Sequence, residues 1–267
     1  MDFDLSGRTA IVTGGGTGIG KAITLELARA GADVAIASRS LEHLEPVAAQ
    51  LVEMGRRSLA VPMDVRDEEM VADMVAKVME AFGHIDILVN NTGVSFEAGV
   101  EEMSLKAWKA VIDIDLNGTY LVSRHVGKEM ITQKKGSIVN IASVAGLRAF
   151  PRQAHYGAAK AGIINFTRSL AAEWGQYNIR VNCVAPGPIL TEMPLKLFQD
   201  HGVQDRDEIM RLWGKGCAIG RCGTPEEVAQ PVVFLASDAA AFVSGATLVV
   251  DGCYELEPIG ALARPAP

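Results

Sequence analysis

Residues 9–20 read TAIVTGGGTGIG, and this stretch decides how the chain begins to fold. The run Thr9–Val12 is short, apolar and rich in β-formers, which predicts a strand. The glycines of 14–20 predict a tight loop, and residues 22–30 have the apolar spacing of a helix. Glycines at such a junction let the backbone approach a pyrophosphate at the helix N-terminus. The stretch therefore predicts a phosphate-binding loop, with a purely structural tight turn as the alternative.

The same alternation of strand and helix continues along the chain. Further strands are predicted at 34–37, 59–61, 85–89, 137–141, 180–184 and 247–250, and helices at 41–54, 68–82, 105–129, 156–174 and from 225, with Ser104 and Thr224 as caps. This order is typical of right-handed βαβ crossovers and a parallel sheet covered on both faces. We predict one doubly wound, Rossmann-type α/β domain over residues 1–256, with a mainly parallel sheet of about seven strands.

Two segments fall outside this pattern. Residues 188–223 are polar, Met-rich and poorly periodic, which predicts a long loop. They follow the carboxyl end of a strand, where open α/β sheets bind ligands, so a substrate lid is favoured over a disordered segment. The tail 257–267 is predicted to be a flexible end or a subunit contact.

Composition and charge limit the class of function. Of 267 residues, 49% are hydrophobic and 21% charged, which is typical of a folded globular chain. The net charge of −7 and the lack of a basic stripe argue against nucleic acid and anionic membranes. The first residues lack the pattern of a signal peptide, so we expect a cytoplasmic protein with a small-molecule partner. The cysteines are too scattered for zinc or a disulfide framework and are predicted to be reduced thiols, with no metal site: Cys183, Cys217, Cys222 and Cys253.

The residues with the clearest chemistry are Tyr156 and Lys160. They are four positions apart at the start of a predicted helix, so their side chains share one face. Ser143 follows the preceding strand. With the Thr-Gly-x-x-x-Gly-x-Gly loop at 13–20, these three residues resemble the short-chain dehydrogenase/reductase family, and the resemblance covers nearly the whole chain.

The resemblance implies hydride transfer between a nicotinamide cofactor and a carbonyl or alcohol. A hydride that reaches a carbonyl carbon leaves an oxyanion that must be protonated, and oxidation needs the reverse proton transfer. Tyr156 is the natural acid and base, because a nearby ammonium favours its phenolate form. Ser143 would polarise the substrate oxygen, and Lys160 would also hold the nicotinamide ribose hydroxyls.

The resemblance also implies cofactor contacts at the strand ends. It assigns Asp64 to the adenine, Asn90 to the cofactor edge and Thr191 to the nicotinamide carboxamide. The complete set of predicted cofactor-binding residues is Gly14, Gly16, Thr17, Gly18, Ile19, Gly20, Ser38, Arg39, Asp64, Val65, Asn91, Gly93, Tyr156, Lys160, Pro186, Gly187, Ile189 and Thr191.

The end of the second strand bears on the choice of cofactor. An acidic residue there would hold the ribose 2′-hydroxyl, but this chain has Ser38 and Arg39. Arg39 could pair with a 2′-phosphate while Ser38 donates a hydrogen bond, which favours NADP(H) over NAD(H). An arginine that is merely exposed at a helix start is the alternative.

Two positions depart from the family pattern. Thr92 stands where the Asn-Asn-Ala-Gly segment usually has alanine, and Asp115 aligns with the asparagine that holds a relay water near the lysine. A carboxylate accepts from water but cannot donate unless it is protonated. Asn117 lies two positions further on and would face another way, so Asp115 is the predicted fourth catalytic residue. His155 is predicted to serve local packing, because its side chain points away from that of Tyr156.

Three functions remain open on these residues. The first is a ketone or aldehyde reductase and alcohol dehydrogenase, with a 3-oxoacyl thioester or gluconate-type substrate. The second is an enoyl or dienoyl thioester reductase, against which the intact Ser143 and Tyr156 argue. The third is a cofactor-binding regulator without catalysis, suggested by Asp115. The resemblance also implies a homodimer or homotetramer, formed by pairing the helices that begin near 105 and 156 with their symmetry mates.

Overall fold

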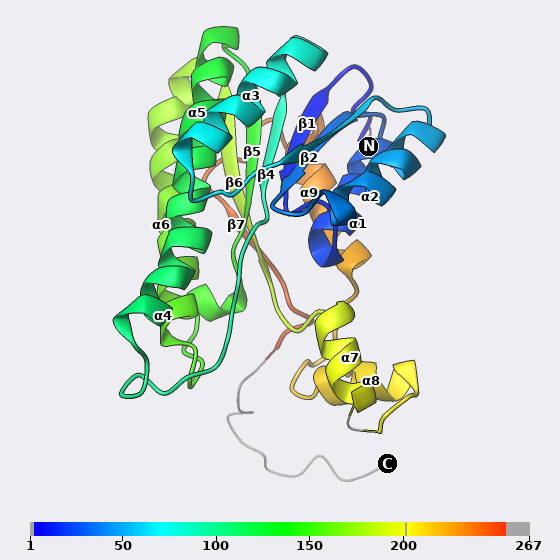
Figure 1. The fold of residues 1–267 in the computed structure, drawn as a ribbon, viewed down its shortest axis with the longest axis vertical. Coiled ribbons are helices and arrows are strands. Elements are labelled where there is room, and N and C mark those ends of the chain that lie inside the picture. Colours follow the sequence, from blue (N-terminus) through cyan, green and yellow to red (C-terminus); the bar gives the residue numbers. More distant parts are fainter. Residues whose placement is uncertain (1–2, 201, 255–267) are drawn as a thin grey trace.

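The computed structural model describes residues 3–200 and 202–254, and it contains one sheet of seven parallel strands in the order β3-β2-β1-β4-β5-β6-β7 (Figure 1). The strands are β1 Thr9–Thr13, β2 Asp33–Ser38, β3 Ser58–Pro62, β4 Ile87–Asn90, β5 Gly136–Ile141, β6 Ile179–Pro186 and β7 Thr247–Val250. The order reverses between β1 and β4, which pair through Ala10 and Ile87. The predicted doubly wound fold is confirmed, and every pairing in the sheet is parallel.

Helices cover both faces of the sheet (Figure 1). One face carries α1 Gly18–Arg29, α2 Leu41–Glu53 and α9 Pro225–Ala236, and the other carries α3 Glu68–Phe82, α5 Gly118–Gln133 and α6 Ala154–Trp174. All residues of β1, β4 and β5 are buried, because strands covered on both faces need apolar side chains on both. No helix in the described part of the chain is long and apolar enough to cross a membrane.

The predicted helix caps have the expected hydrogen bonds. The Ser104 side chain accepts from the backbone N–H of Ala107 at the start of α4 Leu105–Val111. Thr224 and Glu227 form a reciprocal capping box at the start of α9, with Pro225 as the first helical residue. Both helix starts were therefore readable in the sequence.

The long helix predicted at 105–129 is longer and less regular than expected. It continues to the end of α5 at Gln133, and between α4 and α5 the six residues Ile112–Asn117 form a π-helical turn. The Thr119 hydroxyl donates to the backbone carbonyl of Asp115 at 2.6 Å, which gives that carbonyl a partner inside the wider turn. π-helical turns are rare and often mark functional positions. This one carries Asp115 into the interior, where its side chain is fully buried.

The irregular loop predicted at 188–223 is wrong in part, because the segment contains two short helices, α7 Glu192–Asp200 and α8 Arg206–Trp213. They lie beyond the carboxyl edge of the sheet (Figure 1). A small apolar cluster of Leu190, Ile209 and Cys222 holds them together, with Leu195 and Phe198 against it. The apolar residues of these two short helices pack on a separate cluster and not on the sheet, so the segment lacks the long apolar pattern of the other helices. The predicted tail 257–267 lies outside the described residues.

Candidate active site

The glycine loop between β1 and α1 forms a cradle for an anion. Gly14 and Gly18 have positive φ angles of 65° and 51°, which glycine adopts without strain. A Cβ atom on Gly20 would lie 2.0 Å from the carbonyl oxygen of Gly14, so only glycine fits there. The N-cap residue Thr17 makes no side-chain hydrogen bond to α1, which leaves the first N–H groups of this helix facing the loop. This is the arrangement that binds phosphate groups.

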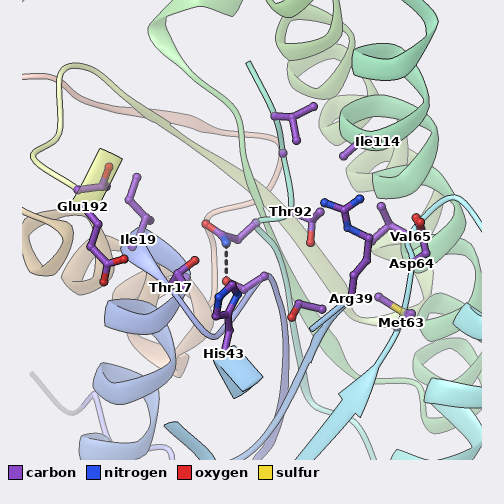
Figure 2. Close-up of a pocket in the computed structure, with 18 residues that line it drawn as sticks. Thr17, Ile19, Arg39, His43, Met63, Asp64, Val65, Thr92, Ile114 and Glu192 are labelled. Carbon is purple, nitrogen blue, oxygen red and sulfur yellow. Dashed lines mark hydrogen bonds between the residues drawn. The ribbon is translucent and has the colours of Figure 1, made fainter. Parts of the chain in front are cut away.

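A cavity of about 520 Å³ lies beside this loop, at the point where the strand order reverses (Figure 2). The predicted cofactor residues that line it are Gly14, Thr17, Gly18, Ile19, Gly20, Ser38, Arg39, Asp64, Val65, Asn91, Gly93 and Thr191. Sequence reasoning missed the other lining residues, His43, Met63, Thr92, Val94, Ile114 and Glu192. Met63, Thr92 and Val94 could have been found, because each lies just past the carboxyl end of a strand.

Three predicted positions lie behind the cavity wall. Gly16 packs against α2, where a Cβ atom would lie 2.6 Å from the carbonyl oxygen of His43. Ile189 is buried and forms a β-bridge with Gly223. Asn90, which the family resemblance assigned to the cofactor edge, is buried inside the fold, and its amide donates to Ser123 and Asn140. The neighbouring Asn91 lines the cavity instead.

The polar groups at the ends of β2 and β3 differ in how they are engaged. Arg39 is exposed and has no ion-pair partner within the described ranges. Figure 2 shows it on the same side of the cavity as Asp64 and Val65. Hydrogen bonds from Arg66 hold the carboxylate of Asp64 and lower its pKa. The Ser38 hydroxyl donates to the carbonyl of Ser40 at 3.3 Å. Among the described residues, Arg39 is therefore the cation at this end of the cavity that has no ion-pair partner.

A second cavity, of about 280 Å³, adjoins the first. Both are lined by Ile19, Asn91, Gly93 and Val94, and the second is also lined by Ser143, Tyr156, Lys160, Pro186 and Gly187. Ser143 begins a 3₁₀ turn after β5, and its Oγ accepts from the N–H of Ala145 at 3.1 Å. The Ser143 hydroxyl proton is thus left for another acceptor. Ser143, Tyr156 and Lys160 therefore lie in a cavity that shares part of its wall with the cavity of the predicted cofactor residues.

Lys160 is almost completely buried beneath this second cavity. Its ammonium nitrogen Nζ donates to the carbonyl oxygen of Ile141 at 3.2 Å, lies 3.1 Å from Oδ2 of Asp115, and is 5.4 Å from the centre of the Tyr156 ring. Burial opposes the charged form of Lys160, but Tyr156 and Asp115 outweigh burial and hold the pKa of Lys160 above its ordinary value. Lys160 is therefore a buried cation that is paired with the carboxylate of Asp115.

Asp115 is held at both carboxylate oxygens. Oδ1 accepts from the backbone N–H of Val94 at 2.9 Å, and Oδ2 faces the ammonium group of Lys160 without a well-aligned hydrogen bond from the described residues. Asn117 lies on the outside of the same turn, where its amide donates to Asp113 at 2.9 Å. The structure thus brings Asp115, and not Asn117, to Lys160.

His155 lies beside Tyr156 and is fully buried. Its ring is 4.2 Å from the ring of Phe96, centre to centre, and neither ring nitrogen has a hydrogen-bond partner among the described residues. Burial lowers the pKa of His155, and Asp115 offsets this only in part. A neutral ring packed against an aromatic neighbour fits the predicted packing role.

The cysteines are free thiols, as predicted: Cys183, Cys217, Cys222 and Cys253. Cys183 lies on β6 in the sheet, where burial raises the pKa of its thiol to about 11. The part of the chain that the structure describes contains no cluster of three or more His, Cys, Asp or Glu side chains that could hold a metal ion.

The residues present fit a dinucleotide in the larger cavity. Gly20 and Gly14 leave room where a Cβ atom would fill the loop, and the start of α1 offers uncapped N–H groups. The hydroxyl of Thr92, which lines this cavity, is buried without a hydrogen-bond partner among the described residues. A cradle for phosphate beside a half-buried Ser and Tyr and a buried Lys defines a class of protein, the nicotinamide-dependent oxidoreductases.

Comparisons with known proteins agree with this class. A family model described as "Enoyl-(Acyl carrier protein) reductase" matches residues 14–255. The 3-oxoacyl-[acyl-carrier-protein] reductase FabG of Chlamydia trachomatis is 41% identical over 249 residues, which are 93% of this chain and 97% of that protein. The D-threitol dehydrogenase of Mycolicibacterium smegmatis is 40% identical over 257 residues, 96% of each chain. The crystal structure of levodione reductase, 34% identical, has a TM-score of 0.86 and covers 92% of this chain and 97% of its own.

The chain belongs to the short-chain dehydrogenase/reductase family. It is an NAD(P)-dependent oxidoreductase that acts on carbonyl and CH–OH groups. The family resemblance, the fold and the main function predicted from the sequence are thereby confirmed.

Proposed function

We propose that this protein is an NADP(H)-dependent reductase of 3-oxoacyl thioesters, with Ser143, Tyr156, Lys160 and Asp115 as its catalytic group. The observation that carries the proposal is the cavity that Ser143, Tyr156 and Lys160 line together, which shares lining residues with the larger cavity beside the glycine loop. The 3-oxoacyl reductase from Chlamydia trachomatis, matched over nearly its whole length, supports the substrate class.

In this proposal Ser143, Tyr156 and Lys160 have different tasks. The nicotinamide supplies the hydride in reduction and accepts it in oxidation. The Ser143 hydroxyl donates to the substrate oxygen, and the phenol of Tyr156 gives that oxygen its proton. The buried ammonium of Lys160 stabilises the phenolate that remains, and it is placed to hold ribose hydroxyls at the floor of the cavity.

Replacement of the phenol tests this assignment. Tyr156→Phe should lower kcat for reduction of a 3-oxoacyl thioester at least about 100-fold, since proton transfer by a positioned side chain contributes roughly that much. NADPH binding, followed by fluorescence, should be retained. Near wild-type turnover by Tyr156→Phe would refute the proposal, and so would binding of NADPH without turnover of any ketone or alcohol, which is the behaviour of an inactive regulator.

The preference for NADP(H) rests on Arg39 and Ser38 at the cavity end where Asp64 is already engaged by Arg66. Loss of a charge-assisted hydrogen bond costs about 1.5–3 kcal/mol. Arg39→Ala should therefore raise KM for NADPH roughly 10- to 100-fold and leave KM for NADH nearly unchanged. Arg29→Ala is the matched control, because Arg29 ends α1 and pairs with Glu26. Equal effects on both cofactors would contradict the preference.

Oxidation of a polyol or sugar acid is the second candidate, because the D-threitol dehydrogenase matches over 96% of this chain, against 93% for the 3-oxoacyl reductase. A steady-state screen with NADPH and NADP⁺, each beside its non-phosphorylated form, separates the candidates. Saturable reduction of 3-oxoacyl thioesters supports the first, turnover of polyols or gluconate supports the second, and reduction of enoyl or dienoyl thioesters in place of both would overturn both.

We also propose that residues 188–223 act as a lid over the substrate. The segment contributes Thr191 and Glu192 to the larger cavity, while α7 and α8 pack on their own apolar cluster. A homodimer or homotetramer is proposed through α4, α5 and α6, since Leu105 on α4 and Tyr120 on α5 are large apolar side chains that are left exposed. Light scattering of the purified protein tests the assembly.

A further inference from the structure

The ion pair between Asp115 and Lys160 is unusual because it is sealed inside the site. The side chains are 0% and 3% exposed, and Oδ2 lies 3.1 Å from Nζ. Charges buried this deeply are costly unless they are paired. The carboxylate of Asp115 therefore holds a negative charge beside the ammonium group of Lys160, which is the cation near Tyr156.

The surrounding backbone is built to keep the pair together. The π-helical turn turns Asp115 inward, and the N–H of Val94 anchors Oδ1. Gly93 covers the pair closely, since a Cβ atom there would lie 2.9 Å from Oδ2 of Asp115 and 3.1 Å from Nζ of Lys160. The carboxylate thus has little freedom to move away from the ammonium group.

We propose that Asp115 is a positioning residue that biases this enzyme toward carbonyl reduction, because its carboxylate offsets the field of Lys160 at Tyr156 and keeps the phenol protonated near neutral pH. The inference rests on the proposed proton transfer by Tyr156. Reduction needs the phenol and oxidation needs the phenolate. A lysine without the carboxylate would favour the phenolate, whereas the pair carries no net charge. Oxidation then becomes efficient only at alkaline pH.

Other charged or titratable groups around the pair do not replace Asp115. Cys183 on β6 faces Lys160, but burial raises the pKa of its thiol to about 11, so it stays neutral. His155 on α6 is buried, its pKa is lowered, and it too stays neutral. Tyr156 is itself the group in question. Asp115 is the carboxylate that faces Lys160 within the described ranges.

Asp115→Asn tests the proposal, because asparagine keeps the shape and removes the charge, while its single acceptor oxygen can either accept from Val94 or face Lys160. We expect the pH limb of log kcat/KM for alcohol oxidation to move to lower pH by about one unit, which is roughly tenfold faster oxidation at pH 7. The alkaline limb of reduction should move by the same amount. Asp113→Asn is the matched control, as Asp113 lies on the same turn and pairs with Asn117. A shift in the control, no shift in Asp115→Asn, or a shift to higher pH would overturn the proposal.

A measurement without substrate separates this inference from the proposed function. The phenolate absorbance of Tyr156 is the difference between the pH titrations of wild type and of Tyr156→Phe. The same difference is taken between Asp115→Asn and the double variant that also carries Tyr156→Phe. In wild type, the Tyr156 absorbance at pH 8 should correspond to less than about a tenth of one phenolate. In Asp115→Asn, the phenolate absorbance of Tyr156 should begin to rise at a lower pH than in wild type. A wild type already largely phenolate at pH 8 refutes the role of Asp115, whether or not Asp115→Asn folds. Failure of turnover alone would refute only the proposed function.

Discussion

Loss of the carboxylate of Glu227, in the first turn of α9, should weaken the fold in a pH-dependent way. Glu227 accepts from the backbone N–H of Thr224 at 2.9 Å and from both terminal nitrogens of Arg221, at 2.8 and 2.6 Å. These contacts, the bonds from Arg221 above all, lower the pKa of Glu227 from 4.5 to about 2. Glu227→Gln removes the charge while it keeps the size of the side chain.

The expected magnitude follows from this pKa and from exposure. A lowering from 4.5 to about 2 would correspond to about 3 kcal/mol if it were fully effective. Both side chains are more than two-fifths exposed, at 42% and 43%, so solvent screening reduces the contribution to about 1 kcal/mol. Because the folded-state pKa is the lower one, this stability is present above about pH 4.5 and disappears as the pH falls toward 2.

Urea unfolding at pH 7 and at pH 3 measures the effect. Glu227→Gln should lower the free energy of unfolding by about 1 kcal/mol at pH 7 and by less than half as much at pH 3. Glu226→Gln is the control, since Glu226 is exposed in the same helical turn, and it should change stability by less than about 0.5 kcal/mol. An equal loss at both pH values, or none at pH 7, would show that the ion pair does not stabilise the fold.

Three further outcomes are expected. Gly20→Ala should weaken NADPH binding at least about tenfold and lower the free energy of unfolding by about 1–3 kcal/mol, because the new Cβ would lie 2.0 Å from a carbonyl of the same loop. Calorimetry measures both effects. Gly175→Ala is the control and should show neither loss, because a Cβ there meets nothing within 4 Å. A thiol reagent should label Cys253 in the folded protein but reach Cys183 only after unfolding, since Cys253 is exposed and Cys183 is buried. Mass spectrometry of the labelled peptides measures the order of labelling, and labelling of Cys183 before Cys253 would contradict the prediction. Asp67→Ala should lower the urea midpoint by the equivalent of about 1 kcal/mol, because it removes the cap that accepts two N–H groups of α3, and an unchanged midpoint would mean that water replaces the cap.

Most of the fold could be predicted because the strands are buried on both faces and the helices are long. Their apolar runs and 3.6-residue spacing dominate local sequence, and the range predicted for α3, 68–82, agrees with the structure at both ends. The glycine loop hid the start of α1, because Gly18 and Gly20 are poor helix formers placed there for the loop. α7 and α8 were missed because their apolar side chains serve a separate small cluster.

The site was predictable where a residue follows a strand end or shares a helix face. Tyr156 and Lys160 meet one cavity because four positions bring two side chains together. Other features depend on backbone geometry that no local pattern encodes. Ile114 lines the larger cavity and Asp115 reaches Lys160 because of the π-helical turn, and spacing on a regular α-helix does not reveal such a turn.

The π-helical turn makes the site depend on residue count as well as on residue type. A single residue accounts for about 100° of rotation along a helix. Deleting one residue from Ile112–Asn117 would let the turn close as ordinary α-helix, which needs one residue fewer for a full rotation than the wider turn does. The helices α4 and α5 would therefore keep nearly the same relative rotation. The inward position within the turn would pass to a neighbouring residue, and Asp115 would lose its place beside Lys160. A one-residue deletion here should thus remove the buried acid and leave the flanking helices in place.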